Sequence, residues 1–253
     1  MLKVERYMKI LNILDERGAV TITELCGTLH TSRATVRRDL VRLDSDKLLE
    51  RSYGGAIAVV KPAMTDIPPA LRQNIQKEEK ARIANIAVNY ITEGNTIYLG
   101  AGTTSRELAA LLRKYRHLTV LTNDIAVAME VSNTENQLIV AGGVLRKSSM
   151  ALLGYYTEQI LKELHVDIAF ISADAVDPDH GFLDFNPDEV MVKRLMIKNA
   201  KKPIMLCDHS KFHKSALVKV CSLSDIELLI TGYELEPDYR QKLLNCDIQV
   251  IQS

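Results

Sequence analysis

From residue 77 onward the sequence alternates between short apolar runs and helical segments, and this alternation limits the fold more than any other feature. The apolar runs are TIYLG, LTVLTN, QLIVAGG, VDIAFIS, PIMLCD, LLITG and DIQVIQ. Helical segments are predicted between them, at residues 77–91, 105–114, 156–164 and 188–200. Short, uninterrupted apolar strands separated by helices predict a parallel sheet that is covered on both faces. We therefore expect a single α/β domain here.

The first 58 residues show a different pattern, with three short helices and a glycine turn. Apolar side chains recur at helical spacing over residues 3–16, and Gly18 follows them. A second helix is predicted after Thr21 or Thr23, because a hydroxyl there can accept a hydrogen bond from a first-turn amide. A third begins at Ser32. Two short extended segments then flank Gly54-Gly55, and adjacent glycines permit a tight hairpin. The pattern predicts a helix-turn-helix followed by a wing.

A proline-rich stretch separates these two patterns. The sequence VKPAMTDIPPA holds three prolines in eleven residues and has no apolar period, which is typical of an extended linker. We therefore predict a small winged helix-turn-helix domain at residues 1–58, a linker at 59–76 and an α/β domain at 77–253.

The composition indicates an intracellular protein without a large net charge. Lys plus Arg and Asp plus Glu number 32 each, so any affinity for a polyanion must come from a local patch. The four cysteines are scattered, which favours reduced thiols. The start of the chain lacks the pattern of a secretory signal, and no apolar run reaches the length of a membrane span. We expect a soluble, cytoplasmic protein.

The third helix concentrates positive charge. The stretch TSRATVRRDL contains three arginines and no acidic residue before Asp39. If Val36, Leu40 and Leu43 face the core, the arginines share the exposed side. A basic helix fits the major groove, where its side chains reach base edges and phosphates. A solvated helix surface is the alternative, but the neighbouring helix, cap and wing favour DNA binding.

A glycine turn follows the first strand of the larger domain, in the sequence TIYLGAGTTSRELAALL. Free amides at a helix start, together with hydroxyls, favour an anion. The turn lacks the Gly-Lys pair of a Walker motif, and Ser105 stands where a dinucleotide fingerprint has its third glycine. Asp124 lies at a suitable distance for a ribose, but it is more simply a helix cap. A small phosphorylated ligand, a nucleotide and a purely structural turn remain the three interpretations.

Both parts of the chain resemble the DeoR family of bacterial transcription regulators. SRATVRRDL matches the family pattern S-x-x-T-[IV]-R-R-D-L, and RSYGGA matches its wing, although His30 stands where the turn usually has glycine. The motifs LTN, AGGVLR, AFISADAV, HGF, DEVMVKRLMI, DHSKF and LSDIELLIT match the sensor domain in order. The resemblance implies a winged helix-turn-helix and an α/β sensor domain related to ribose-5-phosphate isomerase and glucosamine-6-phosphate deaminase, whose GTT turn holds a sugar phosphate.

Two sets of functional residues follow. For DNA contacts we predict Thr21, Ser32, Arg33, Thr35, Arg37, Arg38, Arg42, Arg51 and Tyr53. Carried over by position, the resemblance implies effector contacts for Gly102, Thr103, Thr104, Ser105, Asn123, Gly143, Arg146, Asp174, Glu189, Lys193, Asp208 and Lys211. Glu189 and Lys193 also have a simpler interpretation as a surface pair on one helix.

Two alternatives compete with the transcription regulator that the resemblance implies. Cys207, His209 and His213 could offer three zinc ligands if their segment curled, but no fourth ligand is evident. The chain could also be a sugar-phosphate enzyme with an accessory nucleic-acid domain, yet an enzyme has no need of a DNA-reading helix and a fold does not transfer chemistry. We expect a repressor of carbohydrate-metabolism genes, without catalytic residues, cofactor or metal. It binds operator DNA and a phosphorylated sugar as a homodimer or homotetramer.

Overall fold

The computed structural model describes residues 3–46, 48–58, 75–246 and 248–253, which belong to two compact units, 1–75 and 76–253. Residues 59–74, which make up most of the predicted linker, lie outside the described residues. The predicted domain boundaries therefore stay predictions. No helix in the described ranges is long and apolar enough to cross a membrane.

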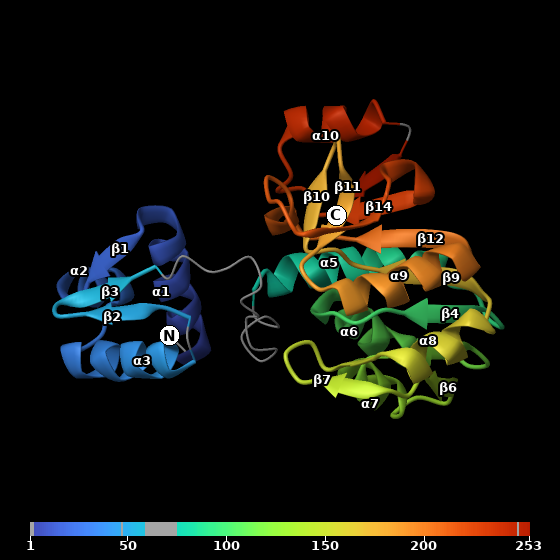
Figure 1. Cartoon of the computed structure of the whole chain (residues 1–253), viewed down its shortest axis with the longest axis horizontal. Helices are drawn as coiled ribbons and strands as arrows, with labels where there is room; N and C mark the ends of the chain where they lie inside the picture. Colours follow the sequence, from blue (N-terminus) through green and yellow to red (C-terminus); the bar gives the residue numbers. More distant parts are fainter. Residues whose placement is uncertain (1–2, 47, 59–74, 247) are drawn as a thin grey trace. The chain divides into compact units, whose positions relative to one another are not determined.

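The first unit has the predicted three helices and a small sheet (Figure 1). Its elements are α1 (Lys3–Arg17), β1 (Ala19–Thr21), α2 (Ile22–Leu29), α3 (Arg33–Ser45), β2 (Glu50–Ser52) and β3 (Gly55–Ile57). The sheet is antiparallel in the order β1-β3-β2, so the predicted hairpin is present and β1 adds a strand that the sequence did not indicate. Gly55 is required there, because a Cβ atom would lie 2.0 Å from the Val20 carbonyl oxygen.

Side-chain caps fix the starts of α2 and α3. The Thr21 hydroxyl accepts from the Glu24 amide at 3.2 Å, and the Glu24 carboxylate accepts from the Thr21 amide at 2.8 Å, which forms a capping box. Ser32 accepts from the Thr35 amide at 3.3 Å. Between the two helices the backbone of His30 is left-handed, with a φ of 47°. Glycine adopts this conformation most readily, which accounts for the glycine that the family pattern has at this turn.

The second unit is built on a seven-stranded parallel sheet in the order β15-β14-β12-β9-β4-β5-β6. All seven apolar runs predicted from the sequence form these strands. Their bounds are β4 (Thr96–Leu99), β5 (Thr119–Thr122), β6 (Gln137–Val140), β9 (Val166–Ile171), β12 (Ala200–Leu206), β14 (Leu228–Thr231) and β15 (Gln249–Gln252).

Helices cover both faces of this sheet, as predicted. They are α5 (Lys77–Ala87), α6 (Thr103–Leu111), α7 (Ile125–Val131), α8 (Tyr155–Lys162), α9 (Pro187–Asn199) and α10 (Pro237–Leu244). Alternate strand residues enter two separate cores. In β4, Ile97 and Leu99 pack with side chains of α5, α6 and α7, whereas Tyr98 belongs to the core that contains residues of α8, α9 and α10. Burial of both faces explains why the strands read as continuous apolar runs.

Smaller elements surround the sheet and were not predicted. A hairpin joins β7 (Val144–Arg146) to β8 (Ala151–Leu153), and an antiparallel sheet contains β10 (Ala175–Asp177), β11 (Gly181–Asp184) and β13 (Val218–Cys221). The helix α10 was also missed. In strands of three or four residues one charged residue leaves no extended apolar run, and β7, β10, β11 and β13 each contain one.

Candidate functional sites

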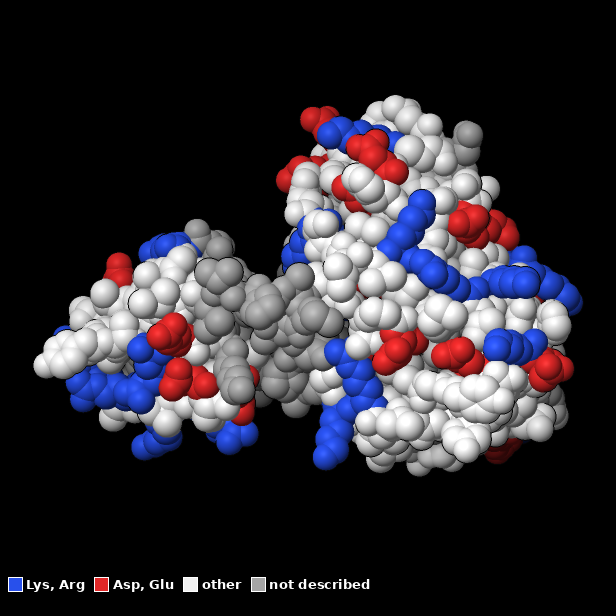
Figure 2. Space-filling model, viewed as in Figure 1, with Lys and Arg blue, Asp and Glu red and all other residues white. Residues whose placement is uncertain are grey.

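The exposed side of α3 is basic. Arg33, Arg37, Arg38 and Arg42 are exposed, whereas Val36, Leu40 and Leu43 are at most 1% exposed. Figure 2 shows Lys and Arg side chains gathered along the part of the first unit where Figure 1 places α3. The structure thus gives the predicted arginines the orientation that a groove-binding helix needs.

A buried ion pair sets the rotation of α3. Asp39 is 2% exposed and accepts hydrogen bonds from Arg6 Nε at 2.7 Å and Arg6 Nη2 at 3.0 Å. A bidentate Arg–carboxylate pair is geometrically specific, so it joins α1 to the inner side of α3. The hydrogen bond to Asp39 raises the pKa of Arg6 above its usual value.

The arginines differ in how strongly the protein engages them. Arg33 Nη2 donates to Thr23 Oγ1 at 3.2 Å, and Arg42 Nε lies 3.1 Å from Asp46 Oδ2. Within the described residues Arg37 and Arg38 form no ion pair, so their guanidinium groups are available to an external anion.

The remaining predicted DNA contacts lie around the caps and the wing. Thr21 and Ser32 use their hydroxyls in the helix caps, and Thr35 Oγ1 lies 3.0 Å from Ser32 Oγ. Arg51 lies on β2, and its backbone amide donates a hydrogen bond to Asp44 Oδ1 at 3.3 Å. Tyr53 is fully exposed at the wing turn.

In the second unit, predicted effector residues follow neighbouring strands of the sheet. The turn at 102–105 follows β4, Asn123 follows β5, Asp174 follows β9 and Asp208 follows β12. Because β12, β9, β4 and β5 are adjacent and parallel, these segments meet at one edge. Ligands of open α/β sheets bind beyond the carboxyl ends of strands. The sheet order therefore brings these four segments to one edge of the domain.

The glycine turn has the conformation expected of an anion site. Gly102 has φ 152, and a Cβ atom there would lie 2.9 Å from Ser172 Oγ. The α6 helix begins at Thr103, so first-turn amides lack partners within their own helix. Ser105 Oγ is fully buried and has no hydrogen-bond partner among the described residues. A buried hydroxyl without a partner is unfavourable, and Ser105 lies in the first turn of α6.

Asp124 occupies one side of this turn. Its carboxylate is 2% exposed and accepts from the amides of Ala126 at 2.6 Å and Val127 at 3.1 Å, which confirms its interpretation as a helix cap. It also accepts from the Gly102 amide at 3.2 Å. Burial raises the pKa of Asp124, and these amide bonds offset part of the rise. The Gly102 amide is thus already engaged, and an anion would use the amides that follow it.

Asn123 and Gly143 have clear roles in packing. Asn123 is 1% exposed, accepts from the Tyr98 hydroxyl at 2.7 Å and donates to the Leu152 carbonyl at 3.0 Å. A Cβ atom on Gly143 would lie 2.1 Å from Thr157 Oγ1. Their assignment as ligand contacts stays a prediction.

Ion pairs connect the other predicted residues. Arg146 Nη1 donates to Glu189 Oε1 at 3.0 Å. Lys211 Nζ lies 3.9 Å from Asp174 Oδ1. The side chain of Lys193 is buried and donates to Asp184. The simpler interpretation of Glu189 and Lys193 as a surface pair is therefore wrong, because each is paired with a residue of a different element.

Asp184 was missed by the sequence analysis, although it is central to this network. It is fully buried, and its Oδ1 accepts from the Asp174 amide at 2.8 Å. Burial raises the pKa of Asp184 to about 6 despite the neighbouring ammonium group. Burial by itself would lower the pKa of Lys193, but the Asp184, Glu189 and Asp174 carboxylates raise it above its usual value. At neutral pH the pair is therefore ammonium and carboxylate.

The three candidate zinc ligands, Cys207, His209 and His213, do not form a cluster. His209 Nδ1 lies 2.6 Å from Glu79 Oε2, whereas His213 Nε2 lies 3.4 Å from Glu236 Oε2. Burial raises the pKa of the Cys207 thiol to about 12, which disfavours the thiolate that binds metal.

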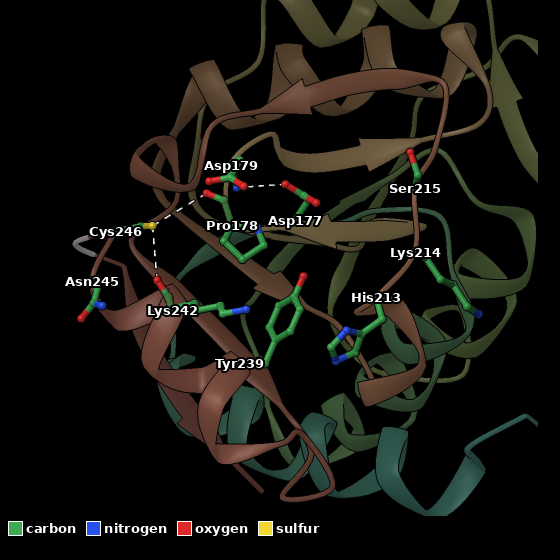
Figure 3. A pocket seen from close by; sticks show the side chains of 10 residues that line it. All are labelled: Asp177, Pro178, Asp179, His213, Lys214, Ser215, Tyr239, Lys242, Asn245 and Cys246. Atoms are coloured by element: carbon green, nitrogen blue, oxygen red, sulfur yellow. Dashed lines mark hydrogen bonds between the residues drawn. The ribbon is translucent and has the colours of Figure 1, made fainter.

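A surface cavity of about 650 Å³ lies beside α10 (Figure 3). Its lining includes Lys214 and Lys242 as well as Asp177 and Asp179, so opposite charges balance there. The Tyr239 hydroxyl is already bonded to the Val176 carbonyl at 2.8 Å. The lining includes none of the predicted effector residues, and we assign it no role.

Comparison with known proteins decides the family. Residues 6–61 match the model of the DeoR-like helix-turn-helix domain, and residues 75–233 match the DeoR C terminal sensor domain. The chain belongs to the DeoR family. It is therefore a DNA-binding transcriptional regulator, and the expectation of a regulator instead of an enzyme is confirmed.

Similar DeoR-family proteins span the full chain. The HTH-type transcriptional regulator GlpR of Haloferax volcanii is 32% identical over 99% of this chain and 98% of its own length. The glycerol-3-phosphate regulon repressor of Escherichia coli K12 is 30% identical over 99% of both. Ribose 5-phosphate isomerase A of Methanocaldococcus jannaschii is a weaker structural match, with 21% identity and a TM-score of 0.41 over 54% of this chain and 55% of its own.

We predict that Arg37 and Arg38 carry DNA binding by this DeoR-family chain. Replacing a phosphate-contacting arginine with Ala should weaken binding to all sequences and lower the salt slope by about one. Replacing a base-contacting arginine should remove roughly 1 to 3 kcal/mol of sequence discrimination. Operator affinity measured across salt concentrations distinguishes the two roles. Arg116→Ala, exposed in the second unit, is the control. Unchanged affinity in both test variants would exclude α3 from the interface.

Proposed function

We propose that this chain is a repressor of carbohydrate-metabolism genes whose operator binding is altered by a phosphorylated sugar at the carboxyl edge of the sheet. It acts in the cytoplasm on double-stranded DNA. Relatives named as repressors include the glycerol-3-phosphate regulon repressor and the putative aga operon transcriptional repressor of Escherichia coli O157:H7, the latter 30% identical over 98% of this chain. The glycine turn at the start of α6 is the observation that carries the ligand class.

The turn favours a phosphate for three reasons. The α6 helix start supplies amides and the positive end of a helix dipole. The hydroxyls of Thr103, Thr104 and Ser105 add donors, and that of Ser105 is buried without a partner among the described residues. Gly102 permits a close backbone approach in a conformation that other residues rarely adopt.

The rest of the edge suits a polyhydroxylated ligand. Asp174 and Glu189 offer carboxylates, whereas Arg146 and Lys211 offer cationic donors. Each is paired with a neighbour and partly accessible, with side chains between 12% and 27% exposed. A sugar hydroxyl both donates and accepts hydrogen bonds. It can therefore donate to the carboxylate of such a pair or accept from the cationic partner. A site that hydrogen-bonds hydroxyls discriminates strongly against ligands that lack them.

The phosphate assignment predicts that Thr103→Glu abolishes the response to the effector. The new carboxylate would compete for the amides of the turn and repel a phosphate. Thr103 is the better site for this change because it is half-buried, whereas Thr104 is only 4% exposed. An acidic side chain at a helix start is also compatible with the helix dipole, so folding should be retained.

Operator affinity is measured with and without a panel of triose, pentose and hexose phosphates. The unmodified chain should shift by roughly 1 to 3 kcal/mol with the active compound. Thr103→Glu should bind the operator normally without shifting, and Ala110→Glu on the same helix should behave like the unmodified chain. A full response of Thr103→Glu would show that the turn is only structural. Turnover of a sugar phosphate without any effect on DNA binding would contradict the repressor.

We also propose that the chain acts as a homodimer or homotetramer. One small winged helix makes few phosphate contacts, and two on repeated half-sites gain through effective concentration. The candidate contact surface consists of the apolar side chains that β6, β7 and α8 expose. Its exposed side chains are Val140, Val144, Leu145, Tyr155, Tyr156 and Ile160. Figure 2 shows few charges over β6 and α7, and β6 is an unpaired sheet edge among the described strands.

Light scattering of the full chain at micromolar concentration should give at least twice the monomer mass. The double variant Val144→Lys with Tyr156→Lys should lower the mass toward the monomer, since it places charges on the apolar surface. Leu217→Lys is the control, because Leu217 is also well exposed, at 62% against 73% for Val144 and 71% for Tyr156, but is not one of the side chains of that surface. A monomeric unmodified chain would contradict the proposal.

A further inference from the structure

The first turn of α5 carries two charged side chains that are buried within the second unit. Glu79 is 2% exposed and Lys80 is 3% exposed. Glutamate and lysine are almost never fully buried unless they are paired. Both side chains point to the same segment, the loop 207–211 that follows β12. This loop contains Asp208 and Lys211, which belong to the proposed effector site.

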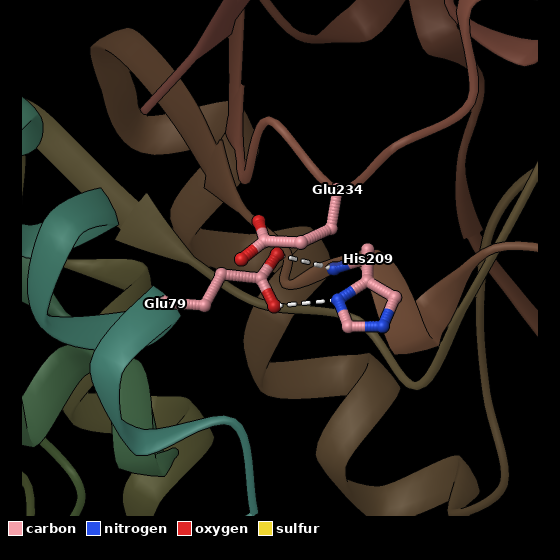
Figure 4. Close-up of side chains that lie close together, drawn as sticks. All are labelled: Glu79, His209 and Glu234. Carbon is pink, nitrogen blue, oxygen red and sulfur yellow. Dashed lines mark hydrogen bonds and ion pairs between the residues drawn. The ribbon is translucent and has the colours of Figure 1, made fainter.

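Glu79 contacts His209 through both carboxylate oxygens (Figure 4). Its Oε1 accepts from the His209 backbone amide at 2.7 Å, and its Oε2 lies 2.6 Å from His209 Nδ1. Burial raises the pKa of Glu79, and the bonds from His209 offset part of the rise. Because one of the two contacts is to the backbone, Glu79 fixes the path of the loop as well as one side chain.

Neighbouring groups keep this contact tightly enclosed. A Cβ atom on Gly232 would lie 2.1 Å from Glu79 Oε1 and 2.3 Å from Glu234 Oε2, so only glycine leaves room for the two carboxylates. Arg82 pairs with Glu234, and its guanidinium lies 4.4 Å from the centre of the Tyr233 ring. The first turns of α5 are thus held on two sides.

A metal ion is not needed to explain the cluster. Glu79, His209 and Glu234 offer ligand atoms within 4.8 Å of one another. However, Glu79 already receives two hydrogen bonds from His209, and Arg82 neutralises Glu234. The charges are balanced by protein groups, which is the usual state of buried carboxylates.

Lys80 provides the second contact with the loop. Its Nζ lies 3.9 Å from Asp208 Oδ2, and Asp208 is 2% exposed. Asp208 Oδ1 also accepts from the Ser210 amide at 3.1 Å. Burial by itself would raise the pKa of Asp208, but Lys211, Lys80 and Ser210 lower it below its usual range. Asp208 is therefore a carboxylate that α5 and the proposed effector site share.

We infer that Glu79 and Lys80 are positioning residues that couple the effector site to the DNA-binding unit. The inference rests on the proposed function. A sugar hydroxyl that engages Lys211 weakens the interaction of this cation with Asp208 and so changes the balance of charges that holds Lys80. The α5 helix begins at Lys77, directly after the segment that leads from the winged helix. A change in the first turn of α5 therefore acts at the point where the chain enters the second unit.

The test separates coupling from binding in the full-length protein. Glu79→Gln removes the carboxylate charge and one of its two acceptor oxygens, and Lys80→Met removes the ammonium group, while both keep side-chain size. Glu78→Gln and Lys77→Met are matched controls, because both residues are exposed on the same helix turn. For each protein, operator affinity is measured by fluorescence anisotropy with and without the sugar phosphate that is most active on the unmodified chain. Binding of that sugar phosphate is measured by calorimetry.

With the unmodified chain and both controls, the sugar phosphate should change operator affinity by about 5- to 150-fold. With Glu79→Gln and Lys80→Met the change should be lost, while sugar-phosphate binding and unliganded operator binding persist. Lys80→Arg keeps the positive charge and should retain the response that Lys80→Met loses, which would show that a positive charge is needed at this position. Thermal unfolding confirms that each variant is folded.

Three results would overturn the inference. A full response in both test variants would show that these contacts do not transmit the signal. Loss of sugar-phosphate binding itself would place Glu79 and Lys80 in the binding site. If no sugar phosphate shifts the unmodified chain, the proposed function fails first, and the coupling fails with it.

Discussion

The second unit depends on a parallel sheet with both faces buried. Because α5, α6 and α7 cover one face and α8, α9 and α10 the other, the strand residues between them are mostly apolar. Charged side chains are therefore placed at the carboxyl edge, where strands end and helices begin. Unpaired amides at the start of α6 and the ends of β9 and β12 meet there. The same constraint that stabilises the sheet creates a polar edge suited to an anionic ligand.

The charges at this edge are paired, but several pairs share members. Asp184 contacts both Lys193 and the Asp174 amide, and Asp174 lies near Lys211. Asp208 lies near Lys80, and the charge of Lys211 lowers the pKa of Asp208. Removing one partner of a buried pair is costly, typically by about 3 to 5 kcal/mol, so a ligand that engages one member perturbs the others. Such a network can convert ligand binding into a shift between two arrangements, provided that the ligand prefers one of them.

Much of this architecture could be predicted from the sequence, and the failures have physical causes. The seven core strands were found because burial of both faces makes them continuously apolar, and the arginine helix because its apolar stripe faces inward. The strands β7, β10 and β13 are short and each contains a charged residue, so they show no extended apolar run. Asp184 gave no signal, because a buried aspartate in GFLDF looks like any strand-end residue. Nothing in the sequence KEEK distinguishes Glu79 and Lys80 from exposed charges at a helix start, and only the fold shows that they are buried. The DNA and effector contacts themselves remain predictions.

Hydrogen exchange on the full chain, with and without the active sugar phosphate, tests the central claim most directly. Exchange reports local opening, so a bound ligand slows it where it contacts the backbone. We predict slower exchange in peptides covering residues 100–106, 172–175 and 206–212, because these loops form the carboxyl edge. The first turn of α5 should also change. Slower exchange confined to other regions, such as the cavity beside α10, would contradict the account.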